Sequence, residues 1–462
     1  MKNLVTIILA AGEGKRMKSG LAKILHPIAG KPLLFYPLTA ARKVKAQKII
    51  IVVGYQGEKV KRTFPDEDIF FVTQGKQLGT GHAAACARDF LTGFKGDVLI
   101  LCGDIPLIKD STLETLLARH REEKNSATIL TTTMKNPTGY GRIVRDHEGL
   151  VRKIIEEKDA TPQGKEIAEI NSGIYCFDAE FLFESLESLS RQNAQNEYYL
   201  TDTIAIARDR GKSVGAVCVV DETEVMGINN RIELAQTSDV MRIRILENLM
   251  LEGVSIINPK DTYIDFGVTI GRDTVIYPNT FLMGGTKVGE NCLIEPGCHL
   301  KDSTIGSQVT VRPASVIEDS IIRDHATIGP FAHIRPGSDV GEDVKIGNFV
   351  EVKKTTIGKG SKASHLTYLG DTTVGSGVNV GAGTITCNYD GVSKHQTIIE
   401  DGVFIGSNTE LVAPVKIGRG ALIGAGSTIT RDVPPDNLAI SRAKQVNFNR
   451  KPFFGKKEEK ES

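Results

Sequence analysis

A glycine-rich segment with two cationic side chains follows the first apolar run of the sequence. It reads Leu9-Ala10-Ala11-Gly12-Glu13-Gly14-Lys15-Arg16-Met17. Backbone N–H groups at the end of a strand, together with cations, are the groups that bind phosphate. The segment lacks the GxxxxGK[ST] pattern of a P-loop, and Met17 stands where GxGxxG has its third glycine. It therefore predicts phosphate binding by a loop of another type, and a plain tight turn is the structural alternative.

Two stretches of the C-terminal half are polar against an aliphatic background. The first holds Lys353, Lys354, His365 and Tyr368, and the second, at residues 387–391, reads Cys-Asn-Tyr-Asp-Gly. Neutral histidine accepts a proton near neutral pH, so His365 is a candidate general base. The alternative is a histidine on a surface loop that takes no part in chemistry.

Aliphatic residues recur at every sixth position around these two stretches. The rows are Ile264, Ile270, Ile276, Leu282, Val288, Ile294 and Leu300; Ile328, Ile334, Val340, Ile346 and Val352; and Ile399, Ile405, Leu411, Ile417, Ile423 and Ile429. A step of six is typical of a hexapeptide β-helix, in which each repeat contributes one short strand and one turn. The step fails between Val352 and Val374 and between Thr386 and Ile399. Because the function of a solenoid often lies where its repeat is interrupted, both intervals are predicted to belong to a site.

Strand and helix signals alternate in the N-terminal half, which predicts an α/β domain with a mostly parallel, Rossmann-like sheet. Ligands of such sheets bind at the carboxyl ends of the strands. The predicted strands are Leu4–Ala10, Lys48–Val53, Ile69–Thr73, Asp97–Cys102 and Ala127–Met134, and helices are predicted at Pro32–Lys43 and Asn230–Glu252. The predicted parts of the chain are an α/β domain at 1–228, a helical linker at 229–252, a β-helix at 253–440 and a tail at 441–462.

Composition narrows the classes of partner. The net charge is +1, from 57 Lys and Arg against 56 Asp and Glu, which gives no reason to expect nucleic acid or a membrane surface as a partner. The seven cysteines show no CxxC spacing and predict reduced thiols, which favours a cytoplasmic protein. No stretch reaches the roughly 18 apolar residues of a membrane span, so no membrane insertion is expected.

The glycine-rich segment matches a known family signature when the residues after it are included. LAAGEGKRM followed by Leu21-Ala22-Lys23-Ile24-Leu25 resembles the LxxGxGxRM…K signature of sugar-1-phosphate nucleotidylyltransferases. With the hexapeptide repeats, nearly the whole chain resembles the bifunctional family of N-acetylglucosamine-1-phosphate uridylyltransferases and glucosamine-1-phosphate N-acetyltransferases. The resemblance implies an α/β nucleotidylyltransferase domain followed by a left-handed parallel β-helix, and synthesis of UDP-N-acetylglucosamine. Lys15 and Ala22 depart from the threonine and proline that are common in such families.

The resemblance implies a uridylyl-transfer site for UTP, N-acetylglucosamine-1-phosphate and Mg²⁺. Asp104 and Asn229 would bind the metal through oxygen, Lys23 and Arg16 would stabilise the phosphates during transfer, and Gln74 would bind uracil. The residues implied to contact UDP-N-acetylglucosamine are Leu9, Ala10, Ala11, Gly12, Lys23, Gln74, Gly79, Thr80, Cys102, Gly103, Asp104, Gly141, Glu156, Asn171 and Asn229.

The resemblance also implies an acetyl-transfer site, where acetyl-CoA meets glucosamine-1-phosphate. His365 would be the general base, with Glu351 to orient it, and Asn388 would bind the sugar or stabilise the oxyanion. The acceptor sugar would contact Arg335, Lys353, Tyr368 and Asn379, and acetyl-CoA would contact Ala382, Asn388, Tyr389, Ser407, Ala425 and Arg442. Because His365 and Arg442 are far apart in the coil pattern, we expect a homotrimer that forms each acetyl site from more than one subunit.

Three alternatives explain fewer of these residues. A single-activity nucleotidylyltransferase with a purely structural solenoid does not need His365 or the polar insertion at Asn388. A non-catalytic sugar-nucleotide sensor does not need Asp104, Asn229 and Lys23 together. A zinc site made of His299, His325 and His333 lacks a recognisable ligand spacing.

Overall fold

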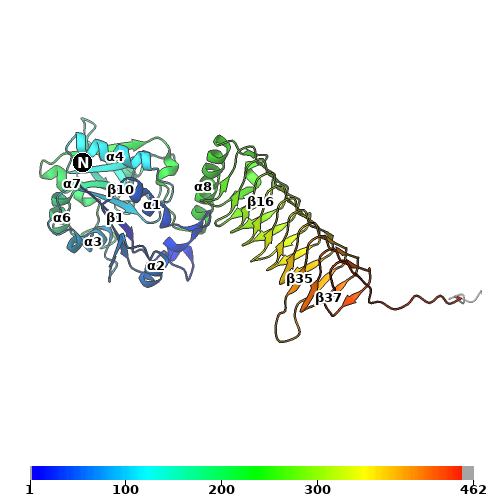
Figure 1. Cartoon of the computed structure of the whole chain (residues 1–462). Helices are drawn as coiled ribbons and strands as arrows, with labels where there is room; N and C mark the ends of the chain where they lie inside the picture. The colour runs from blue at the N-terminus through cyan, green and yellow to red at the C-terminus, as the bar shows by residue number, and fades with distance from the viewer. Residues whose placement is uncertain (1–2, 450–462) are drawn as a thin grey trace, which may run out of the picture. The chain divides into compact units, whose positions relative to one another are not determined.

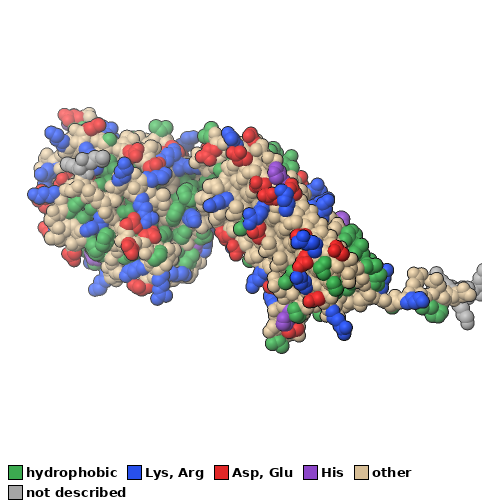
Figure 2. Space-filling model, in the orientation of Figure 1, with side chains coloured by type: hydrophobic (Ala, Val, Ile, Leu, Met, Phe, Trp, Pro, Cys, Tyr) green, Lys and Arg blue, Asp and Glu red, His purple; other side chains and the backbone are tan. Residues whose placement is uncertain are grey.

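The computed structural model describes residues 3–449. The chain divides into two compact units between Ile245 and Leu246, a point that lies within the long helix α8, Arg231–Leu251 (Figure 1). Residues 450–462 of the predicted tail lie outside the described residues. Lys, Arg, Asp and Glu side chains are interspersed over the face drawn in Figure 2. Within the described residues, no helix has the length and apolar character needed to cross a membrane.

The first unit contains a nine-stranded sheet whose main path runs β11-β7-β10-β6-β1-β4-β5. The pairs β1–β4, β1–β6, β4–β5 and β7–β11 are parallel, and β10 is antiparallel to β6 and β7. The mostly parallel sheet is therefore confirmed. The strands are β1 Leu4–Ala10, β4 Lys48–Val53, β5 Ile69–Thr73, β6 Asp97–Cys102, β7 Ala127–Thr133, β8 Arg142–Arg145, β9 Val151–Ile155, β10 Glu169–Asp178 and β11 Val214–Val219.

Both faces of this sheet are covered by helices, which is why its strands are near-continuous aliphatic runs. In β1, Leu4 and Ile8 pack into one apolar core together with α1 and α4, whereas Val5 and Ile7 pack into another together with α3, α6 and α7. The helices are α1 Phe35–Lys43, α2 Gly57–Thr63, α3 Thr80–Ala85, α4 Asp110–Glu122, α5 Pro162–Lys165, α6 Ala179–Glu187 and α7 Asp202–Asp209.

The helix predicted from Pro32 begins later, at Phe35. Lys31 and Pro32 instead form β3, which pairs antiparallel with β2, Pro27–Ile28. Their backbone is extended because it completes this short hairpin, so the helical turn can start only after it. The segment predicted to be helical at Asn230–Glu252 is α8, Arg231–Leu251.

The second unit is a prism of short parallel strands stacked in three sheets of eleven, ten and nine strands. These run from β12 (Ser255–Ile256) to β41 (Leu438–Ala439), from β13 (Thr262–Ile264) to β40 (Thr428–Ile429), and from β14 (Thr269–Ile270) to β38 (Val415–Ile417). The aliphatic residues of the six-residue rows are buried in its interior. Successive coils place like residues in register, as Ile276 pairs with Ile294. The predicted left-handed hexapeptide β-helix is confirmed in class by its parallel sheets and its repeats.

The first predicted interruption of the β-helix is wrong. Strands β29 (Thr356–Ile357), β30 (Lys362–His365) and β31 (Tyr368–Gly370) continue the three sheets. Ile357, Ala363 and Leu369 occupy the interior between Val352 and Val374. Val352 pairs with Leu369, 17 positions later, so two six-residue steps and one of five make a complete coil. The row looked broken because two steps, from Val352 to Ile357 and from Leu369 to Val374, are five residues long and because Ala363 replaces a larger aliphatic residue.

The second interruption is an insertion. Between β34 (Ile385–Cys387) and β35 (Thr397–Ile399) the chain leaves the coil in a loop that projects from the stack (Figure 1). Tyr389 and Lys394 form an antiparallel bridge within it, and His395 N donates to Asn388 O at 2.8 Å. The insertion is therefore a small hairpin, with its own internal pairing.

Candidate active sites

A cavity of about 300 Å³ lies at the carboxyl ends of β1 and β6. This is where ligands of a mostly parallel sheet bind. Ten of the predicted residues line it: Leu9, Ala10, Ala11, Gly12, Lys23, Gln74, Gly79, Thr80, Cys102 and Asp104. Ile24, Gln77, Ala83 and Glu197 also line it and were not predicted. Gln77 Nε2 donates to Ala11 O at 2.6 Å. The only sequence signal for Gln77 was that it lies three residues after the predicted Gln74.

Two oxygens converge on one ammonium group at this cavity. Lys23 Nζ forms an ion pair with Asp104 Oδ2 and lies 3.4 Å from Asn229 Oδ1. Asp104 follows β6 and Asn229 immediately precedes the first turn of α8, so residues 125 positions apart meet at one point. The two side chains predicted to bind a metal are thus brought together around a cation.

Two glycines beside this cavity, one in the loop after β1 and one in the loop after β6, leave little room for a side chain. Gly14 has φ +65°, in the left-handed region, and a Cβ placed there would lie 2.7 Å from Lys23 Cβ. Gly103 also has close neighbours, because a Cβ there would lie 3.2 Å from Ala10 Cβ. Side chains at these positions would displace Lys23 or separate the loops after β1 and β6.

The amide group of Gln74 is fixed by its neighbours. Its Nε2 donates to Gly79 O at 3.1 Å and lies 2.9 Å from His82 Nδ1. Because the NH₂ group makes these contacts, the carboxamide oxygen is the part of Gln74 that can accept from a ligand.

Three further predicted residues form a second group. A Cβ at Gly141 would lie 3.6 Å from both Glu156 Oε2 and Asn171 Cβ, so Gly141, Glu156 and Asn171 are neighbours. Thr201 Oγ1 donates to Glu156 Oε1 at 3.0 Å. Burial raises the pKa of Glu156, and the Thr201 hydroxyl opposes that shift. None of these three side chains lines the 300 Å³ cavity. Arg16 is exposed in the loop after β1.

In the second unit, the predicted acceptor residues lie mostly on one face. Arg335 follows β25 (His333–Ile334), and Lys353 and Tyr368 lie on β28 (Glu351–Lys353) and β31. Asn379 starts β33 (Asn379–Val380) in another sheet, so it is not grouped with them on that face.

A lysine that was not predicted joins this face. The neighbouring ammonium group of Lys394, and after it the charge of Arg335, lowers the pKa of Lys353, so three cations lie close together. Lys394 comes from the inserted hairpin. Because the interval between Thr386 and Ile399 was predicted to belong to a site, the position of Lys394 within it could have identified this residue.

Two of the predicted polar side chains, Tyr368 and Asn388, pack against Gly370, which is buried. A Cβ there would lie within 2.4 Å of Tyr368 Oη and 2.8 Å of Asn388 Nδ2. Asn388 Nδ2 donates to Asp371 Oδ2 at 2.5 Å, which holds Asn388 against the coil, whereas Tyr389 beside it is exposed. The absence of a side chain at Gly370 lets the two polar groups approach.

His365 is oriented by Asn348, and the expectation that Glu351 does so is wrong. His365 Nδ1 lies 2.6 Å from Asn348 Oδ1, in the neighbouring coil. Because that oxygen is an acceptor only, Nδ1 carries the proton and Nε2 is left as the basic nitrogen. Glu351 instead accepts from Arg335 Nη1 at 2.6 Å. Glu351 and His365 lie on different sheets of the prism, which the spacing of the residues did not reveal.

Small residues form a column along the edge that begins at His365. Asn408 N donates to Ala382 O at 2.8 Å, and Gly426 N donates to Ser407 O at 2.8 Å, so Ala382, Ser407 and Ala425 lie on successive coils. Arg442 Nη1 donates to Ala425 O at 2.5 Å and closes the column. The predicted acetyl-CoA residues other than Asn388 and Tyr389 thus follow one line along the prism.

Known proteins match both units. The nucleotidyl transferase family model matches residues 5–224, the GMPPB C-terminal domain model matches 258–365, and the bacterial transferase hexapeptide model (six repeats) matches 396–431. Bifunctional protein GlmU of Pelobacter propionicus is 54% identical over 448 residues, 97% of this chain and 97% of that protein. The bifunctional GlmU proteins of Geobacter sulfurreducens and Shouchella clausii are 52% and 51% identical, over 97% of this chain and 98% of theirs.

The chain belongs to the GlmU family. GlmU proteins are UDP-N-acetylglucosamine pyrophosphorylases and glucosamine-1-phosphate acetyltransferases, and this chain has the domain for each activity. It is therefore a bifunctional transferase, as predicted. Its substrates are, in general terms, nucleotide sugars and acetyl-CoA.

The nucleotidyltransferases of the GlmU family use a divalent metal ion. The residues of this chain fit one, because Asp104 Oδ2 and Asn229 Oδ1 already surround the Lys23 ammonium. Hard divalent cations prefer such oxygen ligands and complete their shell with water and phosphate. Among the described residues, no group of three or more His, Cys, Asp and Glu side chains is placed to hold a metal.

Proposed function

We propose that the first unit transfers UMP from UTP to N-acetylglucosamine-1-phosphate, with Mg²⁺ held by Asp104 and Asn229. The observation that carries this proposal is the convergence of those two oxygens with Lys23 at the cavity after β1 and β6. Mg²⁺ bound there supplies positive charge to the triphosphate. Lys23 and Arg16 stabilise the phosphates, and the backbone of residues 9–12 binds them at the strand end.

The transfer needs no nucleophile from the protein. A phosphate oxygen of the sugar phosphate attacks the α-phosphorus of UTP, the bond from that phosphorus to the bridging oxygen breaks, and pyrophosphate leaves. The chain therefore acts by positioning the two anions and neutralising their charge. Gln74 accepts from the N3–H of uracil through its carboxamide oxygen, because its NH₂ group is already bonded. Gly141, Glu156 and Asn171 contact the sugar.

For the second unit, we propose that His365 Nε2 takes a proton from the amine of glucosamine-1-phosphate as that amine attacks the thioester carbon of acetyl-CoA. The carbon–sulfur bond then breaks, and the thiolate leaves with the proton from His365. Asn348 supports this role because it holds the proton on Nδ1. Arg335, Lys353 and Lys394 bind the phosphate of the acceptor, with Tyr368 and Asn388 around the sugar. Asn379, which lies on another sheet, is the remaining predicted contact of the acceptor.

The column Ala382, Ser407 and Ala425 holds the pantetheine arm, with Tyr389 and Arg442 as further contacts of acetyl-CoA. From His365 to Arg442 the column crosses four coils at about 4.8 Å each, or roughly 20 Å. That length, together with the exposed position of His365, supports a homotrimer in which a second subunit completes each acetyl site. Seven free thiols support a reducing compartment such as the cytoplasm.

One assay tests the two-site assignment. The protein is supplied with UTP, Mg²⁺, acetyl-CoA and glucosamine-1-phosphate, and released pyrophosphate and free thiol are followed separately. Addition of EDTA, with N-acetylglucosamine-1-phosphate supplied, is expected to stop pyrophosphate release and to leave thiol release unchanged. Equal loss of both signals would contradict the assignment of the metal to the first unit alone.

A further inference from the structure

The two proposed metal ligands are carried by two different segments of the first unit. Asp104 begins the segment 104–109, which leads from β6 into α4, and Asn229 ends the segment 221–229, which leads from β11 into α8. Ile228 N donates to Asp104 O at 3.1 Å, so the segments touch beside the ligands. The separation of the two oxygens depends on what else holds these segments together.

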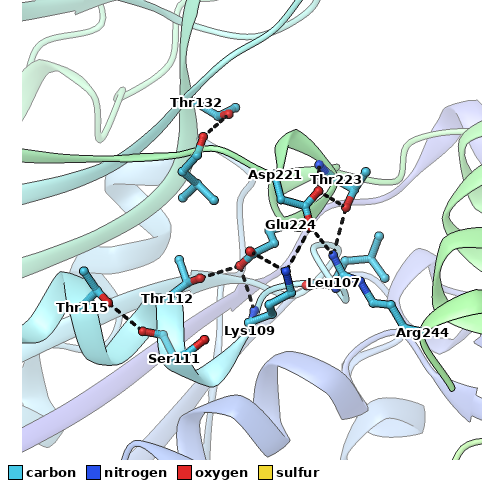
Figure 3. Close-up of polar contacts among 11 residues, drawn as sticks. Leu107, Lys109, Ser111, Thr112, Thr115, Thr132, Asp221, Thr223, Glu224 and Arg244 are labelled. Carbon is cyan, nitrogen blue, oxygen red and sulfur yellow. Dashed lines mark hydrogen bonds and ion pairs between the residues drawn. The ribbon is translucent and has the colours of Figure 1, made fainter. Parts of the chain in front are cut away.

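A buried carboxylate joins the far ends of the two segments (Figure 3). Glu224 is 4% exposed and accepts from Lys109 Nζ at 3.0 Å and from Thr112 Oγ1 at 2.6 Å. Lys109 Nζ also pairs with Asp221 Oδ2 at 3.0 Å. A buried carboxylate requires such partners, so the start of α4 cannot move away from 221–224 without leaving charge unpaired.

Arg244 of α8 binds both segments at once (Figure 3). It donates to Leu107 O at 2.6 Å on the first segment, and to Asp221 Oδ2 at 3.1 Å and Thr223 Oγ1 at 2.9 Å on the second. A planar guanidinium can make these bonds in fixed directions, which an ammonium group cannot. Arg244 is therefore placed to set the distance between the segments.

The same helix also fixes Asn229 directly. Asn230 Oδ1 accepts from the backbone N–H groups of Ile232 and Glu233, and Glu233 Oε2 accepts from Asn229 N at 2.6 Å. This reciprocal cap ties the ligand to the first turn of α8. Arg244 lies on the same continuous helix. Its hydrogen bonds to the two segments therefore also restrict the position of Asn229 at the start of that helix.

We propose that Arg244 and Glu224 are positioning residues for uridylyl transfer, which fix the spacing of Asp104 and Asn229 and thereby set the affinity for the divalent cation. This inference rests on the proposed metal site. Neither residue lines the cavity, and neither is among the residues proposed to contact the substrates or the metal. Their effect is expected in metal binding, since partners beyond the ligands typically change metal affinity by about 10- to 100-fold.

The test compares Arg244→Lys, Glu224→Gln and the milder Thr112→Val with the wild-type protein. Mn²⁺ binding is measured by electron paramagnetic resonance in the presence of UDP-N-acetylglucosamine, and the apparent activation constant for Mg²⁺ is measured in the uridylyl assay. We expect Mn²⁺ to bind about tenfold more weakly to the Arg244 and Glu224 variants, and kcat at saturating Mg²⁺ to change much less. Acetyltransferase activity, measured on the same samples, reports that the chain is folded.

Arg152→Ala is the matched control, because Arg152 also bridges two elements of this unit, pairing with Asp209 at 2.8 Å, but holds neither segment. Wild-type Mn²⁺ affinity in Arg244→Lys and Glu224→Gln would overturn the proposal, as would an equal loss in the control. Asp104→Asn separates this failure from failure of the metal site itself. If Asp104→Asn weakens Mn²⁺ binding and Arg244→Lys does not, only the positioning role is wrong; if Asp104→Asn has no effect, the site is wrong and the proposal falls with it.

Discussion

Asp104 and His365 belong to different units, so each activity can be removed alone. Asp104→Ala removes the carboxylate of the proposed metal pair and is expected to lower kcat for pyrophosphate release at least about 100-fold, with CoA release near the wild-type rate. His365→Ala is expected to do the reverse, because it removes the proposed base and leaves Asn348 Oδ1 without its contact to Nδ1. The measurement is the pair of assays on each purified variant. Loss of both activities in a folded variant would refute the assignment.

The charge of Glu156, one of the residues proposed to contact the sugar, affects the stability of the first unit. Burial raises its pKa, so the folded state favours the protonated carboxyl more than the unfolded state does. Ionised Glu156 therefore costs stability above the unfolded-state pKa of about 4.3, and this cost grows as the pH rises to the folded-state pKa. Below that window the cost is absent.

Glu156→Gln is accordingly expected to raise the Tm of the first unit at pH 7 and to leave it unchanged at pH 4. The amide oxygen can still accept from Thr201, so that contact is kept. The same change is expected to raise KM for the sugar phosphate. Thermal unfolding at the two pH values checks the first statement, and a Tm gain of the same size at pH 4 would show that ionisation is not its cause.

At the scale of an element, the column of small residues on the β-helix makes a sharp prediction. Ala425→Leu places a larger side chain on the exposed edge between Ser407 and Arg442 without touching the buried interior. KM for acetyl-CoA is expected to rise about tenfold or more, with little change in KM for glucosamine-1-phosphate. Leu422→Ala, an exposed position on the same coil but on a flat face, is the control. Equal effects of both changes would contradict the role of the column.

The periodic elements of this chain were predictable because burial follows a fixed step. The six-residue rows identified the interior of the prism, and apolar runs identified β1, β4, β5 and β6 to the residue. Two errors came from the same source: two steps of five with Ala363 between them looked like a gap, and Pro32 looked helical although a hairpin holds it extended. Periodicity reports burial on one element and does not report pairing between elements.

Contacts between elements account for the site residues that were missed or misassigned. Glu197 reaches the cavity after β1 from a loop more than 100 residues away, and Lys394 reaches Lys353 through the inserted hairpin. Glu351 is close to His365 in sequence, yet it lies on another sheet and pairs with Arg335. Most lining residues were implied by the resemblance to sugar-1-phosphate nucleotidylyltransferases, and they meet because loops that follow neighbouring parallel strands lie at one sheet edge.

At the scale of the whole molecule, complementation tests the shared acetyl site. Chains with His365→Ala are co-expressed with chains that carry Arg442→Ala, each with a different tag. If a site takes these residues from different subunits, mixed trimers contain some intact sites, and acetyltransferase activity is expected to exceed that of either variant alone. Doubly tagged assemblies with no recovery would reject the shared site, and a monomer in analytical ultracentrifugation would reject the trimer.

The regular stacking of the coils means that the number of coils sets the distance between residues at the two ends of the column. Each coil adds a fixed rise of about 4.8 Å to the distance between His365 and Arg442. Because neighbouring coils contact only each other, one coil can be added or removed without changing the rest of the prism. A deletion of residues 408–425, which make up one coil, would shorten the column by a single rise while leaving His365 and Arg442 at its two ends. We expect an enzyme shortened in this way to prefer acyl donors whose arm, the part that corresponds to pantetheine in acetyl-CoA, is shorter by about the same length.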